Sequence, residues 1–444
     1  MSNILTLSLV ALLGLLSPSG ASPPAGQTPP ASPRAAQVIG QQVPVYAGPF
    51  GSSEALTVLS SGTRLEVVSE SEGWYQVRLD GDRTGWVRDR YLRLGATSAS
   101  TDTPSSNQRN DWGGSESQRI PFPSRTILAT YYVWDQNSRP MLPRLSPQHL
   151  ENVVLVPWAY RIEATGALTP SLPAQSLARA LKDAGEAGAH TWLLVHNFDG
   201  SRFDPQAAHK LLSSATARSR TVREVRRAAA SWAVNGVHLD IEAVPPADGK
   251  LLTRFVEELA AALHADGRLL TLAVPAKSSD DRRSTWSGAY DYAALGKIAD
   301  YITIMTYDEH YLDSEPGPVA SLPWVEKVIS YATTRIPARK ILLGIAGYGY
   351  DWPSSGRARS VSYPRVQALL NQSGVTSGWD DRARAPFLRY REMGIERIVW
   401  YQDRRNTSLQ LNLVGRYGLG GIAFWRLGME DPGVWDEVSL RLER

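Results

Sequence analysis

The sequence contains no cysteine among its 444 residues. This absence excludes disulfide bonds, thiolate zinc sites and a cysteine nucleophile, so packing must hold the fold together. The seven histidines are scattered without a short ligand spacing, and we therefore expect no metal site and no cofactor. Lysine and arginine form no dense block and the net charge is only +3, which leaves little electrostatic support for nucleic-acid binding.

Phenylalanine is scarce as well, with 7 residues against 14 Trp and 18 Tyr. The rings of Trp and Tyr are amphipathic and can line a wet groove, although we expect most of them in the core. Apolar residues make up 43% of the chain and charged residues 20%. These values exclude a largely disordered or collagen-like protein, and the length suggests about two to three domains.

The N-terminal apolar run, residues 4–16, is too short to cross a bilayer and has the length of a signal-peptide core. Ser19, Gly20 and Ala21 supply small residues for cleavage. We therefore expect a signal peptide over 1–21 and an exported protein, periplasmic, extracellular or bound to the cell wall, with no other contact with the membrane. Because no Lys or Arg precedes the run, an uncleaved anchor is the alternative.

A small all-β domain is expected over residues 37–95, after a Pro-rich spacer at 22–36. Short alternating apolar runs lie on either side of Asp80 and Gly81, and an Asp-Gly pair between two such runs is a strong hairpin signal. Residues 96–124 are rich in Ser, Thr, Asn, Gly and Pro and show no apolar periodicity. This composition predicts a flexible linker.

From residue 125 to 444, apolar strand-like runs alternate with amphipathic stretches of helix length. This alternation is typical of parallel βα units, and eight of them suit a (β/α)8 barrel, for which about 250 residues is usual. The candidate strands are residues 127–133, 153–158, 191–195, 236–241, 269–274, 301–305, 341–345 and 421–425. The surplus length predicts an inserted α+β subdomain at about 350–415, before the last strand.

The fourth candidate strand ends in an unusual run of polar residues. Side chains alternate across a strand, so His238, Asp240 and Glu242 share one side while the residues between them face the other. Both sides of a parallel barrel strand should be apolar, and barrels of this kind keep their active sites at the C-terminal strand ends. A binding or catalytic site is therefore expected here.

At this strand the sequence resembles the family 18 glycoside hydrolases, whose motif is Asp-x-x-Asp-x-Asp-x-Glu. Asp240 and Glu242 match its last two acids, whereas Asn235 and His238 stand in place of the first two aspartates. Three further segments match in the family's order, namely residues 305–308 at strand six, 347–352 after strand seven and Trp425 at strand eight. Residues 197–198, 244–246 and 307–310 look most like the spore-cortex-lytic N-acetylglucosaminidase subgroup.

The resemblance implies roles for individual residues. Glu242 would be the general acid, Asp240 would orient and stabilise the reacting acetamido group, and Tyr307 would hold its carbonyl. His238 and Asn235 are expected to lie around this pair, with His238 a hydrogen-bonded interior histidine. The residues expected to contact the sugars are Trp425, Asp308, Tyr348, Trp158, Trp352 and Phe198; for the aromatic ones, plain barrel core is the alternative.

The spacing of the two acids bears on the mechanism. Two residues apart on one strand, Asp240 and Glu242 have Cα atoms about 6.6 Å apart and adjacent side chains, so they do not face each other across a sugar. That arrangement suits neither a two-carboxylate retaining enzyme nor an inverting one. It suits substrate assistance, in which the 2-acetamido oxygen of the substrate attacks the anomeric carbon and configuration is retained.

The small domain resembles bacterial Src-homology-3-like domains through Gly73-Trp74-Tyr75 and Gly85-Trp86-Val87. Such domains often bind cell-wall material, which favours peptidoglycan over chitin as the polysaccharide partner; a spacer role is the alternative. We therefore expect an exported monomeric glycosidase that cleaves polymers containing N-acetylglucosamine. The alternatives are a chitin or chito-oligosaccharide hydrolase and a non-catalytic, lectin-like wall protein, and the presence of Glu242 favours an enzyme.

Overall fold

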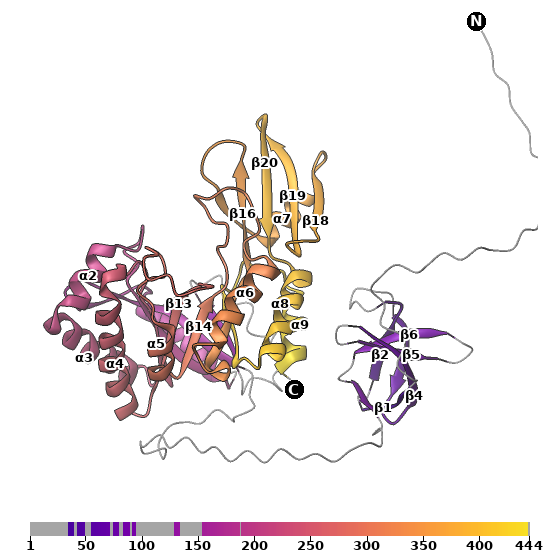
Figure 1. Ribbon diagram of the computed structural model, residues 1–444, viewed down its shortest axis with the longest axis horizontal. Helices are drawn as coiled ribbons and strands as arrows, with labels where there is room; N and C mark the ends of the chain where they lie inside the picture. Colours follow the sequence, from indigo (N-terminus) through magenta and orange to yellow (C-terminus); the bar gives the residue numbers. More distant parts are fainter. Residues whose placement is uncertain are drawn as a thin grey trace, which may run out of the picture. The chain divides into compact units, whose positions relative to one another are not determined.

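The computed structural model describes residues 34–39, 42–48, 55–71, 74–79, 83–88, 91–94, 128–133, 153–186 and 188–442 (Figure 1). The expected signal peptide at 1–21 and the expected linker at 96–124 lie outside these residues. The chain divides into two compact units, Met1–Trp112 and Gly113–Arg444. The first unit contains one sheet and the second contains two.

The first unit is a seven-stranded antiparallel sheet in the order β3-β2-β6-β5-β4-β1-β7. Its strands are β1 (Arg34–Val38), β2 (Gln42–Tyr46), β3 (Ala55–Ser60), β4 (Arg64–Ser71), β5 (Trp74–Arg78), β6 (Thr84–Arg88) and β7 (Leu92–Leu94). Strand β1 begins inside the range expected for the spacer, because Ala36 and Val38 alternate with exposed residues and pack into the core. This sheet confirms the expected small all-β fold.

The second unit contains a closed parallel barrel, as the sequence predicts. Of the nine strands in its main sheet, all but β10 (Leu168–Pro170) form a ring of parallel neighbours that closes where β8 pairs with β9. In ring order the strands are β8 (Leu128–Val133), β9 (Val153–Ile162), β11 (His190–His196), β12 (Gly236–Asp240), β13 (Leu269–Pro275), β14 (Tyr301–Met305), β15 (Ile341–Ala346) and β21 (Gly421–Trp425).

Helices connect these strands and cover the outside of the barrel. They are α1 (Ala174–Glu186), α2 (Pro205–Ser213), α3 (Ala215–Ser231), α4 (Gly249–Ala265), α5 (Tyr292–Ile298), α6 (Leu322–Thr333), α8 (Arg404–Tyr417) and α9 (Val434–Leu442). In α4 the buried residues Leu252, Phe255, Leu259 and Leu263 recur every three or four positions, which produces one apolar face. That face packs into the main core between the strands and the helices.

An α+β subdomain is inserted between β15 and α8, and in Figure 1 its strands stand together to one side of the barrel. It is a five-stranded antiparallel sheet in the order β17-β16-β20-β19-β18, with one helix. Its elements are β16 (Tyr348–Pro353), β17 (Arg359–Ser362), α7 (Tyr363–Leu370), β18 (Thr376–Asp380), β19 (Ala385–Glu392) and β20 (Ile395–Tyr401). The insertion is confirmed, but it ends earlier than residue 415, because α8 buries Leu411 and Val414 in the main core as a barrel helix.

Candidate active site

A cavity of about 730 Å³ opens at the C-terminal ends of the barrel strands. Most of the residues that the sequence predicted for the site line it. These are Glu242, Asp240, His238, Tyr307, Asp308, Trp158, Phe198 and Trp425. They come from segments as far apart in the chain as residues 158 and 425, so closure of the barrel is what brings them together.

Asp240, the last residue of β12, and Glu242, two residues beyond the strand, both face this cavity. Val237, Leu239 and Ile241 point outward into the main core, as side-chain alternation requires. Asp240 and Glu242 are only 6% and 9% exposed. Burial raises the pKa of both carboxyl groups, and the neighbouring charges of Asp240 and Asp308 raise the pKa of Glu242 further. Glu242 is therefore suited to hold a proton near neutral pH.

Three contacts fix the backbone around Glu242. The side-chain amide of Asn197 donates to the Glu242 carbonyl at 2.9 Å, and its oxygen accepts from the Glu242 N–H at 2.9 Å. The hydroxyl of Tyr290 donates to the Ile241 carbonyl at 2.7 Å. Ala243 has a positive φ of 55°, which turns the chain away directly after the acid. The carboxyl group is thus held by its own main chain rather than by a flexible loop.

We expect Asn197→Ala to lower kcat and the free energy of unfolding together. The change leaves two buried backbone groups of Glu242 without partners, at a cost of roughly 1–3 kcal/mol each. Denaturant unfolding and steady-state kinetics measure the two effects. Asn371→Ala is the matched control, because Asn371 is an exposed residue beyond the end of α7. A wild-type kcat in Asn197→Ala would show that the amide does not position the acid.

Asp308 lies opposite the acids at the end of β14, with a positive φ of 61°. Its Oδ1 accepts hydrogen bonds from the hydroxyls of Tyr348 at 2.6 Å and Tyr350 at 2.9 Å. The side chain opens to the cavity but lies deep among protein atoms, and this loss of solvent raises its pKa while the two tyrosines oppose the rise. Asp308 is therefore held in one orientation and adds negative potential to the cavity.

Two expected sugar contacts are not part of the cavity wall. Tyr348 is buried and its hydroxyl donates to Asp308. Trp352 is 2% exposed and its indole nitrogen donates to the Ser314 carbonyl at 2.9 Å. The expectation that they form sugar platforms is corrected accordingly. Of the three aromatic residues that alternate along β16, Tyr350 is the one that lines the cavity.

The two residues that replace motif aspartates lie in different places. His238 lies on the cavity wall, fully buried, with Nδ1 at 2.7 Å from the Thr271 hydroxyl; burial lowers its pKa to about 3, so it stays neutral. Asn235 precedes the first residue of β12 at the opposite end of the strand and accepts a hydrogen bond from the Thr191 N–H at 2.9 Å. Asn235 thus connects the beginnings of β11 and β12, and it does not lie near Asp240 and Glu242, contrary to our expectation.

Aromatic side chains line the cavity beside Asp240 and Glu242 and form what we call the aromatic wall. Trp158 stacks on His196 with ring centroids 4.1 Å apart and contacts Trp425 at 5.1 Å. Burial lowers the pKa of His196 to about 3, so a neutral ring supports the tryptophan. Phe198 and Phe203, with centroids 5.2 Å apart, continue the wall. Flat apolar surfaces next to carboxyl groups suit the faces and hydroxyls of sugars.

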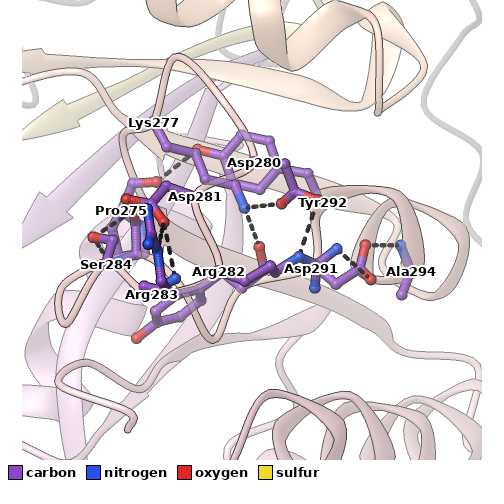
Figure 2. Close-up of polar contacts among 12 residues, drawn as sticks. Pro275, Lys277, Asp280, Asp281, Arg282, Arg283, Ser284, Asp291, Tyr292 and Ala294 are labelled. Atoms are coloured by element: carbon purple, nitrogen blue, oxygen red, sulfur yellow. Dashed lines mark hydrogen bonds and ion pairs between the residues drawn. The ribbon is translucent and has the colours of Figure 1, made fainter. Parts of the chain in front are cut away.

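The loop after β13 contributes Trp286, which is 52% exposed and lines the cavity. A network of polar contacts holds this loop, and Figure 2 shows the buried ammonium of Lys277 donating to Asp280, a contact of 3.2 Å. The same ammonium donates to the Tyr290 carbonyl at 2.6 Å. Arg282 bridges Asp280 and Asp291 at 2.9 and 3.1 Å. The exposed ring is therefore carried on a fixed loop.

Neither a metal nor a cationic partner is evident at the acids. Within the part of the chain that the structure describes, no group of three or more His, Asp or Glu side chains could hold a metal ion, and the cavity lining that it describes includes no Lys or Arg. Oδ1 of Asp240 is buried and has no hydrogen-bond partner among the described residues. This atom is available to a ligand that offers a donor.

Sequence reasoning missed Asn197 as the clamp on Glu242, and it missed Tyr290, Tyr350 and Trp286. Asn197 follows directly after β11, so the rule that polar residues at strand ends gather at one rim could have found it. Tyr290 and Trp286 belong to an irregular loop without periodicity, and no pattern in the sequence marks them.

Two family models match the chain. The model of glycosyl hydrolases family 18 matches residues 198–430, and the model of the bacterial SH3 domain matches residues 42–93. The first match contains the acids Asp240 and Glu242, the two tyrosines that donate to Asp308, and Trp425. The second covers the strands from β2 to β7.

Proteins similar to this chain include enzymes named for lysis of spore cortex and chitinases. The cortical fragment-lytic enzyme of Bacillus subtilis is 31% identical over 249 residues, which are 55% of this chain and 58% of that enzyme. The crystal structure of the spore cortex-lytic enzyme SleL of Bacillus cereus superposes with a TM-score of 0.63 and 25% identity, over 71% of this chain and 74% of that one. A chitinase of Chromobacterium violaceum superposes with a TM-score of 0.65 and 32% identity, over 72% of this chain and 99% of that one.

Proposed function

The chain belongs to family 18 of the glycosyl hydrolases and carries a bacterial SH3 domain, and from this premise we propose that it is an exported enzyme that cleaves peptidoglycan at β-linked N-acetylglucosamine. The family matches confirm the resemblance seen in the sequence. One observation carries the proposal: the buried side chain of Glu242 lines the cavity, where loss of solvent and the charges of Asp240 and Asp308 raise the pKa of its carboxyl group.

A protonated Glu242 can act as the general acid. It would donate its proton to the oxygen of the glycosidic bond as the bond to the anomeric carbon breaks. The resulting carboxylate would then remove a proton from the water that completes hydrolysis. Burial and the neighbouring acids favour the neutral form beforehand, so the proton is present when the substrate binds.

The nucleophile in this proposal is the acetamido oxygen of the substrate. Asp240 and Glu242 extend from one strand, and Asp308 is occupied by two tyrosine hydroxyls, so none of the three is well placed to attack the far side of the sugar. The free Oδ1 of Asp240 can accept the acetamido N–H and stabilise the positive charge of the oxazolinium ion. Tyr307 would hold the acetamido carbonyl in position for attack.

The sugars would bind across the aromatic wall. In this proposal Trp425 and Trp158 support the sugar whose bond is broken, and Phe198 and Trp286 contact neighbouring sugars. Asp308 orients the acetamido group and keeps the potential at Glu242 negative. His238, neutral at working pH, packs beside Asp240 and does not exchange protons with the substrate.

Peptidoglycan is preferred as the substrate for two reasons. The relatives named for lysis of spore cortex act on wall material, and a bacterial SH3 domain on the same chain can tether the barrel to the wall and raise the local substrate concentration. The similarity to a chitinase supports chitin or chito-oligosaccharides as the second candidate. A lectin-like role is disfavoured because the acid Glu242 is retained.

Digestion of purified peptidoglycan and of chitin oligomers, followed by mass spectrometry of the new reducing ends, tests the proposal. We expect N-acetylglucosamine at the reducing ends of peptidoglycan products. N-acetylmuramic acid at those ends would assign the cleavage to the other bond of the polymer, and products from chitin alone would favour the second candidate.

The charge of Asp308 should be visible in the pH dependence of kcat/KM. The general acid must be protonated, so activity falls as pH rises through the pKa of Glu242. Asp308→Asn removes a charge that raises this pKa, and the alkaline limb of the profile should therefore move to lower pH. Asp281→Asn, in an exposed loop position, is the matched control. A limb that moves to higher pH, or equally in both variants, would contradict the electrostatic account.

Export would depend on the segment 1–21, which we propose to be a signal peptide. Among the residues that the structure describes, no helix combines the length and hydrophobicity needed to cross a bilayer. We propose a wall-associated monomer in which the SH3 domain, residues 37–95, binds wall polymer and the segment 96–124 acts as a linker to the catalytic domain, residues 125–444.

A further inference from the structure

A second hollow, of about 710 Å³, lies between the loop after β14 and the inserted subdomain. We call it the insertion hollow. Its wall is built from residues 313–316 on one side and from β16, β19 and β20 on the other. Asp313 lines both the insertion hollow and the catalytic cavity. The two spaces therefore adjoin, and a ligand in one can extend a branch into the other.

A network of ion pairs and hydrogen bonds centred on Asp351 connects the strands that form the insertion hollow. Asp351, 1% exposed, accepts from Arg397 at 2.8 Å, from Arg359 at 2.9 Å and from the Tyr390 hydroxyl at 2.7 Å. Arg359 also bridges to Glu392 at 2.8 Å. These contacts join four strands of the insertion at one point. The wall is thus shaped before any ligand arrives, which lowers the entropic cost of binding.

Two charged side chains on this wall have no ion-pair partner in the part of the chain that the structure describes. The guanidinium of Arg389 makes no hydrogen bond or salt bridge there; it lies 5.8 Å from the centre of the Phe387 ring, and its charge acts only at longer range on Glu396. The carboxylate of Glu315 makes no hydrogen bond or ion pair there, whereas its main-chain carbonyl contacts His310 and Ser314. By contrast, Arg391 is paired with Glu396 at 2.8 Å. One cation and one anion therefore remain for a ligand.

We propose that the insertion hollow binds the stem peptide of the peptidoglycan strand whose sugars occupy the catalytic cavity. The inference rests on the proposed function and extends it to the part of the substrate that is not sugar. A stem peptide branches from every second sugar and must leave the cavity sideways. It carries free carboxylates, and where its third residue is a diamino acid it also carries an amine. Arg389 would bind a carboxylate and Glu315 the amine.

This arrangement gives the enzyme a means to distinguish peptidoglycan from chitin. Chitin has the same acetamido sugars but no branch, so it would fill the catalytic cavity and leave the insertion hollow empty. A charged hydrogen bond between guanidinium and carboxylate is among the stronger polar contacts in proteins. Its loss should weaken binding of peptide-bearing strands and leave bare strands unaffected.

Titration calorimetry of the full-length protein tests the inference without relying on turnover. The Glu242→Gln background prevents hydrolysis, and the two probes are a disaccharide tetrapeptide from peptidoglycan and the same disaccharide after the peptide has been removed by an amidase. We expect the peptide-bearing probe to bind about tenfold more tightly. Arg389→Glu should abolish this ratio, and Glu315→Gln should reduce it.

Arg382→Glu is the matched control, because Arg382 is an exposed arginine of the same insertion that lines neither cavity; it should keep the ratio. Equal affinity for both probes in the Glu242→Gln protein, or a ratio that survives Arg389→Glu, would overturn the inference. Failure of the proposed function is distinguishable, because it would appear as an absence of new reducing ends when the wild-type protein is given peptidoglycan.

Discussion

Glu242→Gln is expected to remove nearly all hydrolysis while the fold and glycan binding remain. Glutamine keeps the shape and can still contact the sugar, but it has no proton to donate to the leaving oxygen. General acid catalysis of this kind contributes about 10²- to 10⁴-fold, so kcat should fall at least that far with little change in the dissociation constant. Reducing-end assays on soluble N-acetylglucosamine oligomers measure the first quantity, and calorimetry measures the second.

The same variant should gain stability where the wild type loses it. Because the pKa of Glu242 is raised in the folded protein, the folded state holds a proton that the unfolded chain releases above its ordinary pKa of 4.5. Stability from this group is complete below that value and is lost as pH rises through the raised pKa. Urea unfolding should therefore show the free energy of unfolding of the wild type falling relative to that of the glutamine variant as pH rises above 4.5. If Glu242→Gln hydrolysed the oligomers at the wild-type rate, Glu242 would not be the general acid.

Asp240→Asn is expected to have the second largest effect, a loss of about 10²-fold in kcat. In the proposed mechanism the carboxylate stabilises positive charge that appears on the acetamido group only as the oxazolinium ion forms, so KM should change much less than kcat. Asparagine keeps the volume and one acceptor atom but removes the charge. Steady-state kinetics on one oligomer across the pH range separate the two constants.

The pH profile of this variant adds a second readout. Asp240 raises the pKa of Glu242, so its replacement should also move the alkaline limb to lower pH. A variant that raises KM alone, with kcat unchanged, would mean that Asp240 binds the ground state of the substrate and does not act in the reaction.

Much of the barrel could be predicted because its strands are buried on both faces. Runs such as residues 301–305 and 421–425 are mostly apolar, and the structure has strands with the same bounds. The end of the insertion was harder, because α8 has the same amphipathic pattern whether it covers the barrel or belongs to a subdomain. Only its packing against the main core decides between the two.

The site was predictable where side-chain alternation governs it and not where loops do. His238 and Asp240 share the inner face of β12 because of the two-residue repeat, and Glu242, two residues beyond the strand, continues it into the cavity. The same repeat also puts Tyr348, Tyr350 and Trp352 on one face, but the loop after β14 covers Trp352 and leaves Tyr350 in the cavity. Asn235 occupies a position of the family motif, but it precedes Asp240 by five residues of extended chain and therefore lies at the opposite end of the barrel.

The central claim is that the acetamido oxygen of the substrate, and no side chain of the enzyme, attacks the anomeric carbon. A series of aryl chitobiosides whose 2-acetamido group carries zero, one, two or three fluorine atoms tests it most directly, because each fluorine makes the carbonyl oxygen less nucleophilic and barely alters its size. We expect kcat/KM to fall steeply with each fluorine. A rate that is independent of fluorination would contradict it and would assign the attack to a group of the protein.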